Sequence, residues 1–434
     1  MKPLFSLLFA LIPIGAGLTA AEITWQPNAN MDSQLFPSLI IATATQRPAD
    51  DDDNEPDPTL LGDPYGAVGI SIAVPKSGAK VQVTLLENGV MNKSTWSGVL
   101  DEADTDYFIA PKINYKFEQL RKVRQQVPLN VTFAVKVNGK EIGEQTETLT
   151  LRTINDCPFG VSEAEETIHE EDQEGEAHAG ADAEDEEEET DETSADQPET
   201  ETEGGGYTDL GWMFAAYVNE NSPIVDQVLK EALATKIVDS FAGYQKGPGE
   251  ALKELLAIWA ALQKRGIHYS NITTTAGGSQ TIYSQHVRFV DESLANEQAN
   301  CVDGSVLFAS IMRKLGFRAF LVTVPGHMFM GVYLSPDGNY RVGLETTMLG
   351  SSKDQEKEAL DKFKGLQEVR GTLEKGVAES AAWKTFVTAL AVGTLSLDEN
   401  QAKFEVQDQP QYQITDIDAA RKDGIMPISY QKAE

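Results

Sequence analysis

The stretch that decides the fold runs from residue 301 to residue 346 and reads CVDGSVLFASIMRKLGFRAFLVTVPGHMFMGVYLSPDGNYRVGLET. Apolar side chains recur at helical spacing over 301–315 and Gly316 follows, so the pattern predicts a helix that ends there. The spacing then changes to that of strands, which are expected at 319–324, 328–334 and 340–346. The turn residues 335–338 separate the last two strands. A helix followed by an antiparallel sheet is typical of an α+β domain.

Further helices are expected on both sides of this stretch. Ser222 and Pro223 supply an N-cap and a first-turn proline before one apolar face, and a second apolar pattern ends at Gly266. The last part of the chain predicts more helices and a short β segment near Tyr412, without a motif that indicates chemistry. We therefore expect an α+β domain over 207–434 with a helical C-terminal extension.

The first third of the chain has the pattern of β structure. Apolar residues alternate over 81–85 and over 131–137, and Asn138-Gly139 supplies the residues of a tight hairpin turn. Two more strands are expected, at 36–43 and 67–74. Short strands separated by turn residues indicate a β-sandwich of immunoglobulin type over 22–160.

Acidic residues are concentrated at 161–206, a segment that holds 21 Asp and Glu and neither Lys nor Arg. It has too little apolar surface to fold, so we expect a disordered linker between two domains. His169 and His178 within it raise the alternative of weak cation binding. A second acidic run, at 50–53, lacks the regular ligand spacing of a calcium loop and is expected to be a solvated loop.

The whole chain carries 68 acidic against 35 basic residues, a formal net charge of −33. Nucleic-acid binding depends on Lys and Arg that contact phosphates, so this charge argues against such a partner. Residues 1–21 combine Lys2 with an apolar run and small residues, which predicts a cleaved Sec signal peptide. No later segment is long and apolar enough to span a bilayer, so the mature chain is expected to be periplasmic or secreted.

The two cysteines, Cys157 and Cys301, leave either one disulfide between them or at least one functional thiol. Cys301 stands at the first turn of its predicted helix, where unpaired N–H groups and the helix dipole favour a thiolate. A cysteine nucleophile also needs a base. Among the five histidines, His327 follows Pro325-Gly326 at the junction of two strands, where it can face a neighbouring helix end. The others lie in the acidic segment (His169 and His178), directly after a helix (His268) and in an extended segment (His286).

An acidic partner for His327 follows from the predicted hairpin. If Leu334 faces Tyr340, Glu345 faces Phe329, which lies two residues from His327 on the same face of the sheet. Diagonal neighbours of this kind are about 7–8 Å apart at the backbone, so the Glu345 side chain can reach the imidazole. A slip of one residue would place the two on opposite faces, and Glu345 would then be an exposed carboxylate.

Four ordered blocks carry a resemblance to a known family: SQHVRF at 284–289, QANCVDG at 298–304, VPGHMF at 324–329 and LETTM at 344–348. Over about 222–350 the chain resembles the transglutaminase-like (papain-like) superfamily, and more narrowly its exported bacterial members of poorly defined function. The stretch NDCPF at 155–159 resembles a companion domain of that group. The resemblance implies a papain-like α+β core with a catalytic triad of Cys301, His327 and Glu345.

Two residues depart from the family pattern. Ala299 stands where many members have Gly, and Glu345 stands where the third member is often Asp. The backbone N–H of Cys301 and the side chain of Gln298 are the candidates for stabilising an oxyanion. Asp303 could be mistaken for the triad acid, but within the first turn of the helix it is expected to stabilise the helix terminus.

These observations favour an exported cysteine acyl enzyme that cleaves or transfers amide bonds of envelope peptides or proteins. Cys301 would attack the carbonyl, His327 would move the proton, and Glu345 would orient His327. No cofactor and no metal site are expected. Two alternatives stay open: a non-catalytic binding or envelope-assembly protein built on the same scaffold, and a disulfide that occupies Cys301.

Overall fold

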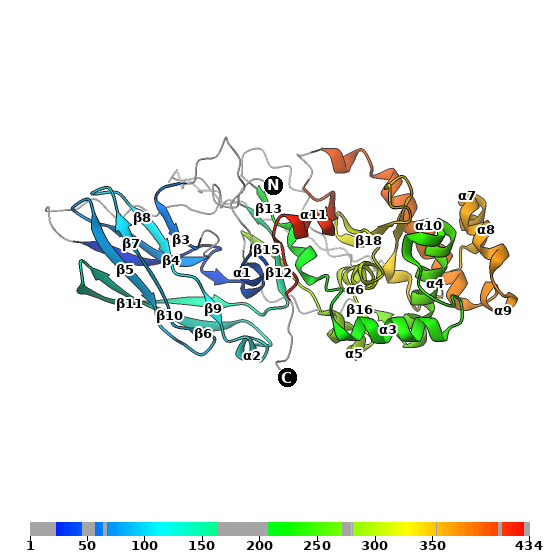
Figure 1. Ribbon diagram of the computed structural model, residues 1–434, viewed down its shortest axis with the longest axis horizontal. Helices are drawn as coiled ribbons and strands as arrows, with labels where there is room; N and C mark the ends of the chain where they lie inside the picture. The colour runs from blue at the N-terminus through cyan, green and yellow to red at the C-terminus, as the bar shows by residue number, and fades with distance from the viewer. Residues whose placement is uncertain are drawn as a thin grey trace, which may run out of the picture.

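The computed structural model describes residues 23–45, 57–63, 67–162, 207–270, 279, 281–352, 354–406 and 410–428. They form an elongated molecule with a β unit at one end and a helix-rich α+β unit at the other (Figure 1). The expected signal peptide, the acidic run 50–53 and most of the acidic segment, including His169 and His178, lie outside these residues. No helix within the described ranges has the length and apolar character needed to cross a membrane.

The β unit consists of two main sheets around one apolar core. Burial alternates along its long strands as the sequence predicts, and Asn138 and Gly139 both take positive φ in the two-residue turn between two of them. The first sheet is β1 (Thr24–Ala29), β4 (Val68–Ala73), β8 (Tyr107–Ala110) and β3 (Leu60–Gly62), in that order. The second is β2 (Gln34–Leu35), β11 (Lys140–Leu151), β10 (Val127–Val137), β5 (Ala79–Leu85) and β7 (Ser94–Leu100). The short strands β6 (Met91–Asn92) and β9 (Asn114–Tyr115) pair separately, and α2 (Phe117–Leu120) follows them.

Residues 36–43 were expected to form a strand, and this prediction is wrong. They contain helix α1 (Pro37–Ala42), in which Pro37 occupies the first turn, where its missing N–H costs nothing. The helix lies between two cores, with Phe36 and Leu39 in the core of the α+β unit and Ile40 in that of the β unit. Side chains are therefore buried on every face, and the apolar run has no periodicity that would separate a helix from a strand.

The α+β unit is built around a sheet with the strand order β19, β18, β17, β20. These strands are β17 (Ala319–Val324), β18 (His327–Tyr333), β19 (Arg341–Leu344) and β20 (Gln413–Asp416). Helix α6 (Cys301–Lys314) packs on β17 and β18, and α10 (Ala381–Glu399) packs on β19. The other helices are α3 (Pro223–Ala234), α4 (Pro248–Lys264), α5 (Val290–Asn296), α7 (Glu356–Lys362), α8 (Lys364–Thr372), α9 (Lys375–Ala378) and α11 (Ile417–Lys422). The expected helix and strands over 301–346 are thus confirmed.

A third sheet lies between the two units and changes the expected domain boundary. Strand β12 (Asp156–Ser162) is its centre, with β13 (Tyr207–Asp209) on one side and β15 (Ile282–His286) on the other. Val161 and Ser162 therefore belong to a strand, although the linker was expected to begin at 161. Because Ser162 pairs with Tyr207, residues 163–206 leave and re-enter the fold at neighbouring ends of paired strands. The chain is a multidomain α+β protein in which the acidic segment is inserted into the connecting sheet.

Candidate functional site

Cys301 is the first residue of α6, and the residues around it form a cap on that helix. The side chain of Asn300 accepts a hydrogen bond from the backbone N of Asp303 (2.8 Å), and the Asp303 carboxylate accepts one from the backbone N of Asn300 (3.2 Å). This reciprocal pair is a capping box. Asp303 thus stabilises the helix terminus, as the sequence predicts, and its carboxylate is engaged there.

The Asp303 carboxylate is also bound from outside the helix. Arg288 donates to it twice, from its backbone N (2.7 Å) and from Nη1 of its guanidinium (2.7 Å). Both side chains are largely buried, so loss of either partner would leave an unpaired charge in the interior. The position of Cys301 therefore depends on the segment that carries Arg288.

His327 begins β18, directly after a two-residue turn. Val324 pairs with His327, so Pro325 and Gly326 are the turn residues, and Gly326 takes a φ of 66°. Proline at the first and glycine at the second central position suit a turn that needs positive φ at the second. The turn places the imidazole at the end of the sheet, half-buried, where α6 begins.

Glu345 lies where the hairpin register was expected to place it. Met330 pairs with Leu344 and Tyr333 with Arg341, which is the predicted register. Oε2 of Glu345 lies 2.7 Å from Nε2 of His327. Oε1 accepts hydrogen bonds from the backbone N (3.1 Å) and the hydroxyl (2.6 Å) of Thr347. The expected contact between Glu345 and His327 is present, and the carboxylate is buried with both oxygens engaged.

Charges on both sides of the ring determine the protonation of His327. Burial lowers the pKa of His327, but hydrogen bonds with Cys301 and Glu345, together with the negative charges of both, raise it to about 10. Burial raises the pKa of Glu345, but its bonds to His327 and Thr347 lower it below its usual value overall. An imidazolium next to a carboxylate is the favoured state of this pair at neutral pH.

Two glycines, Gly304 and Gly343, allow the elements that carry Cys301 and Glu345 to pack closely. A Cβ on Gly304 of α6 would lie 2.6 Å from the Thr346 hydroxyl, so glycine lets the helix approach the residue after Glu345. A Cβ on Gly343 would lie 2.3 Å from the backbone O of Gly393 in α10. The backbone N of Glu345 also donates to the backbone O of Ala389 (3.0 Å). Helix α10 thus positions Glu345, a role that no local sequence signal indicated.

Strand β16 (Gln298–Ala299) lies directly before α6 and pairs in parallel with β14 (His268–Tyr269). Gln298 is exposed on β16, and its role as an oxyanion donor stays a prediction. Tyr269 was not singled out from the sequence. Burial raises the pKa of Tyr269, and the negative charges of Cys301 and Glu345 raise it further. It remains 47% exposed, which makes it accessible to a ligand at this site.

The remaining candidates lie apart from this group. Cys157 is buried in β12 and is not bonded to Cys301, so the structure contains no disulfide between them. Burial and the neighbouring Asp156 raise the pKa of Cys157 well above its ordinary value, which makes it an unreactive thiol. Nδ1 of His286 lies 3.7 Å from Asp156. Among the described residues, no group of three or more His, Cys, Asp or Glu side chains could hold a metal ion.

Comparison of the chain with protein-family models, with curated proteins and with solved structures found no match.

Proposed function

We propose that the protein is an exported cysteine acyl enzyme of transglutaminase-like type, with Cys301, His327 and Glu345 as its catalytic triad. The observation that carries the proposal is the position of His327 between a buried carboxylate and a cysteine at a helix N-terminus. The carboxylate orients the ring and the helix terminus favours a negative sulfur, which are the two requirements of a cysteine nucleophile.

The contact with Glu345 determines which ring nitrogen acts on the thiol. Because Nε2 faces a carboxylate, it carries a proton in either charge state of the ring. Nδ1 is then the nitrogen that exchanges a proton with Cys301. When Cys301 gives up its proton to Nδ1, a thiolate forms beside an imidazolium.

The reaction follows from this arrangement. The sulfur of Cys301 attacks the carbonyl carbon of an amide, and the carbonyl oxygen becomes an oxyanion near the backbone N–H of Cys301. The C–N bond then breaks as Nδ1 of His327 gives its proton to the leaving amine, and a thioester remains. Water or a second amine attacks the thioester, loses its proton to His327 and releases the acid or a new amide.

The wider assignments belong to the same proposal. The two-sheet N-terminal unit is interpreted as an immunoglobulin-like sandwich, and the α+β unit as a papain-like core. A Sec signal peptide at 1–21 would deliver the protein to the periplasm or the exterior, where envelope peptides or proteins are the proposed substrates. Tyr269 and Gln298, both exposed beside Cys301, are placed to contact such a substrate.

The proposal is tested by the rate at which iodoacetamide alkylates Cys301, with peptide mapping to separate it from Cys157. We expect wild-type Cys301 to react below neutral pH faster than free cysteine, since thiolate is the reactive form. His327→Ala should slow the reaction by about 100-fold and Glu345→Gln by about tenfold, in the range of a lost proton-transfer partner. Glu297→Gln changes an exposed carboxylate near Cys301 and should leave the rate unchanged.

The rival function is a binding or envelope-assembly protein that uses the same scaffold without catalysis. It predicts that Cys301 reacts no faster than free cysteine and that neither His327→Ala nor Glu345→Gln changes the alkylation rate. That result would contradict the enzyme proposal and leave the scaffold function in its place.

A further inference from the structure

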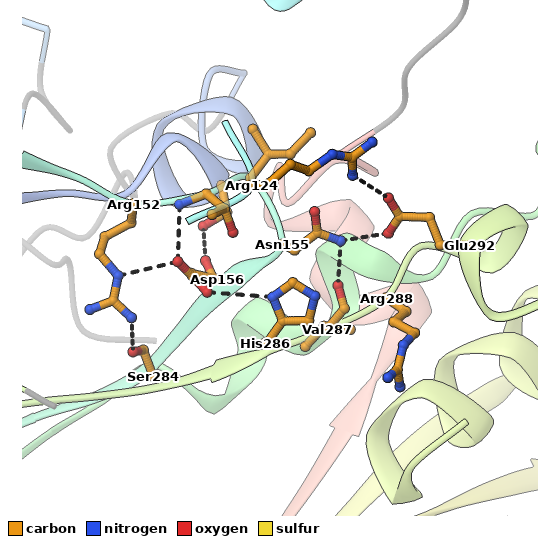
Figure 2. Close-up of polar contacts among 12 residues, drawn as sticks. Arg124, Arg152, Asn155, Asp156, Ser284, His286, Val287, Arg288 and Glu292 are labelled. Carbon is orange, nitrogen blue, oxygen red and sulfur yellow. Dashed lines mark hydrogen bonds and ion pairs between the residues drawn. The ribbon is translucent and has the colours of Figure 1, made fainter. Parts of the chain in front are cut away.

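The turn that ends the β unit contacts the segment that leads to Cys301. Asn155 is buried, and its Nδ2 donates to the backbone O of Val287 (2.9 Å) and to Oε2 of Glu292 (2.7 Å) (Figure 2). The backbone N of Val287 donates in return to the backbone O of Asn155 (2.7 Å). One residue of the turn thus fixes residues 287–292 through both its side chain and its backbone.

The residue after the turn, Asp156 at the start of β12, makes a parallel set of contacts. Asp156 accepts a hydrogen bond from Nε of Arg152 (3.2 Å), and its other oxygen lies 3.7 Å from Nδ1 of His286 (Figure 2). Burial raises the pKa of Asp156, but these partners lower it below its usual value overall, so the carboxylate is charged. The charged Asp156 keeps the end of β15 in place beside Asn155.

The segment held in this way continues into the cap of α6. Arg288 directly follows Val287, and it binds Asp303 through both its backbone N and its guanidinium. Asp303 in turn caps the helix that begins with Cys301. Hydrogen bonds thus join Asn155 to Val287 and Arg288 to Asp303, and the chain itself joins Val287 to Arg288, so Asn155 is connected to the first turn of the Cys301 helix.

A cavity of about 270 Å³ lies beside these contacts. Its lining includes Asn155, His286, Arg288 and Glu292, together with Arg124 from the β unit. Val287 and Val290 of the segment are buried in the core of the α+β unit, so packing holds its apolar side. On the side of the cavity, the hydrogen bonds of Asn155 are contacts that hold the segment to the β unit.

We propose that Asn155 is a positioning residue for Cys301: the turn of the β unit sets the direction of the catalytic sulfur through Val287, Arg288 and Asp303. The inference rests on the proposed function, because it assigns Asn155 a role in that same site. A displacement of about 1 Å at a reacting group is enough to lower a rate severalfold to 100-fold. The β unit is then part of the catalytic apparatus and not an independent module.

The test uses Asn155→Asp in the full chain. The substitution keeps the shape of the side chain but turns a carboxylate oxygen toward Glu292 and toward the backbone O of Val287. We expect alkylation of Cys301 to slow about tenfold and the amides of residues 287–304 to exchange hydrogen faster. In the double variant Asn155→Asp, Glu292→Gln the side-chain amide of residue 292 can donate to the new carboxylate, but the backbone O of Val287 still lacks its donor, so only part of both effects should be recovered.

The matched control is Asn28→Asp, which removes a hydrogen bond from Nδ2 of an asparagine to Ser71 (3.1 Å) inside the β unit. It should leave both readouts at the wild-type level. If Asn155→Asp behaves as this control does, the inference is overturned. Should Asn155→Asp fail to fold, Glu292→Gln alone is decisive, since it must produce a smaller change in the same direction.

The two proposals fail in different ways. If wild-type Cys301 shows no reactivity that depends on His327, the proposed function falls, and hydrogen exchange over residues 287–304 alone decides whether Asn155 positions the helix. If wild-type Cys301 is activated but Asn155→Asp changes neither exchange nor alkylation, the function stands and the role of Asn155 falls.

Discussion

The carboxylate of Glu345 is held from two sides, by the ring of His327 and by Thr347. A carboxylate that was free to rotate would lose side-chain entropy each time it bound the imidazole. Here the bonds from Thr347 remove that freedom in advance. A glutamate has one more rotatable bond than an aspartate, and the hydrogen bonds from Thr347 fix this longer side chain.

The raised pKa of His327 predicts how stability varies with pH. The folded-state pKa of about 10 lies above the ordinary value of 6.5. The charged imidazole therefore adds stability that is fully present below about pH 6.5 and is lost as pH rises toward 10. Chemical unfolding between pH 6 and pH 10 should show a fall in the free energy of unfolding that His327→Gln largely removes.

The control for this prediction is His268→Gln, at an exposed histidine on β14. It should keep the pH dependence of the wild-type protein. If His327→Gln also keeps that dependence, the charges of Cys301 and Glu345 do not act on the ring as the structure indicates.

At the scale of elements, strand β19 and helix α10 approach each other closely at Gly343 and Gly393. A Cβ on Gly393 would lie 2.7 Å from the backbone C of Gly343 and 2.8 Å from the backbone N of Glu345. Backbone atoms on both sides leave no flexible group that could move aside. The separation between α10 and β19 is thus fixed by the absence of side chains, and the position of Glu345 is fixed with it.

Gly393→Ala should therefore affect both stability and the site. We expect a loss of about 1–3 kcal/mol in the free energy of unfolding, because an added methyl group is forced into a filled interior. Alkylation of Cys301 should slow as well, since Glu345 moves with β19. Denaturant unfolding and iodoacetamide kinetics on the same preparation provide the measurement.

A matched glycine lies in another helix of the same unit. A Cβ on Gly371 of α8 would meet nothing within 4 Å. Gly371→Ala should raise stability by about 0.5–1 kcal/mol through helix propensity alone, without a change in alkylation. A Gly393→Ala protein as stable as wild type would show that the two elements can separate without cost.

The register of the hairpin could be predicted from the sequence, and the support of the site by α10 could not. The pairing of β18 with β19 follows from the alternation of side chains and from a short turn, both of which are local. The contact of Gly393 with Gly343 joins residues on separate elements, and neither glycine differs in its local sequence from one in a loop. Tyr269 was missed for the same reason, because only the pairing of β14 with β16 brings it to Cys301.

At the scale of the whole molecule, the sequence predicted two units of the right class but separated them at the wrong place. The change in composition at residue 161 predicts the end of the first domain there. Strand β12 crosses that position, since it runs from Asp156 to Ser162, and it pairs with β15 of the second unit. It contains Pro158 and lacks alternation, because it is covered on both faces. Amino-acid composition indicates which segments of a chain can fold, but it does not indicate the strand with which a given strand pairs.

The insertion of the acidic segment between paired strands leads to a further prediction. Ser162 and Tyr207 are partners in the ladder of β12 and β13, so a two-residue Asn-Gly turn can replace residues 163–206. If the segment forms no packed structure, as its composition predicts, the shorter loop should raise the free energy of unfolding by up to about 2–3 kcal/mol. Denaturant unfolding of the two proteins measures the difference.

A second variant separates loop length from loop charge. Replacing residues 163–206 by Gly and Ser at equal length removes the carboxylates but keeps the closure entropy. Its stability should stay closer to wild type than that of the shortened protein. A shortened protein that is less stable than wild type would show that the acidic segment packs on the fold.

The connecting sheet also sets the order in which the molecule can fold during synthesis. Strand β12 leaves the ribosome long before β15, its partner more than a hundred residues later in the chain. Until that partner arrives, β12 has an unpaired edge, and the β unit cannot acquire its final contacts with Val287 and Glu292. Contacts of such long sequence separation form slowly. The step that joins the two units is therefore a late one, and a chain arrested before residue 286 would present an open strand edge to chaperones and to other chains.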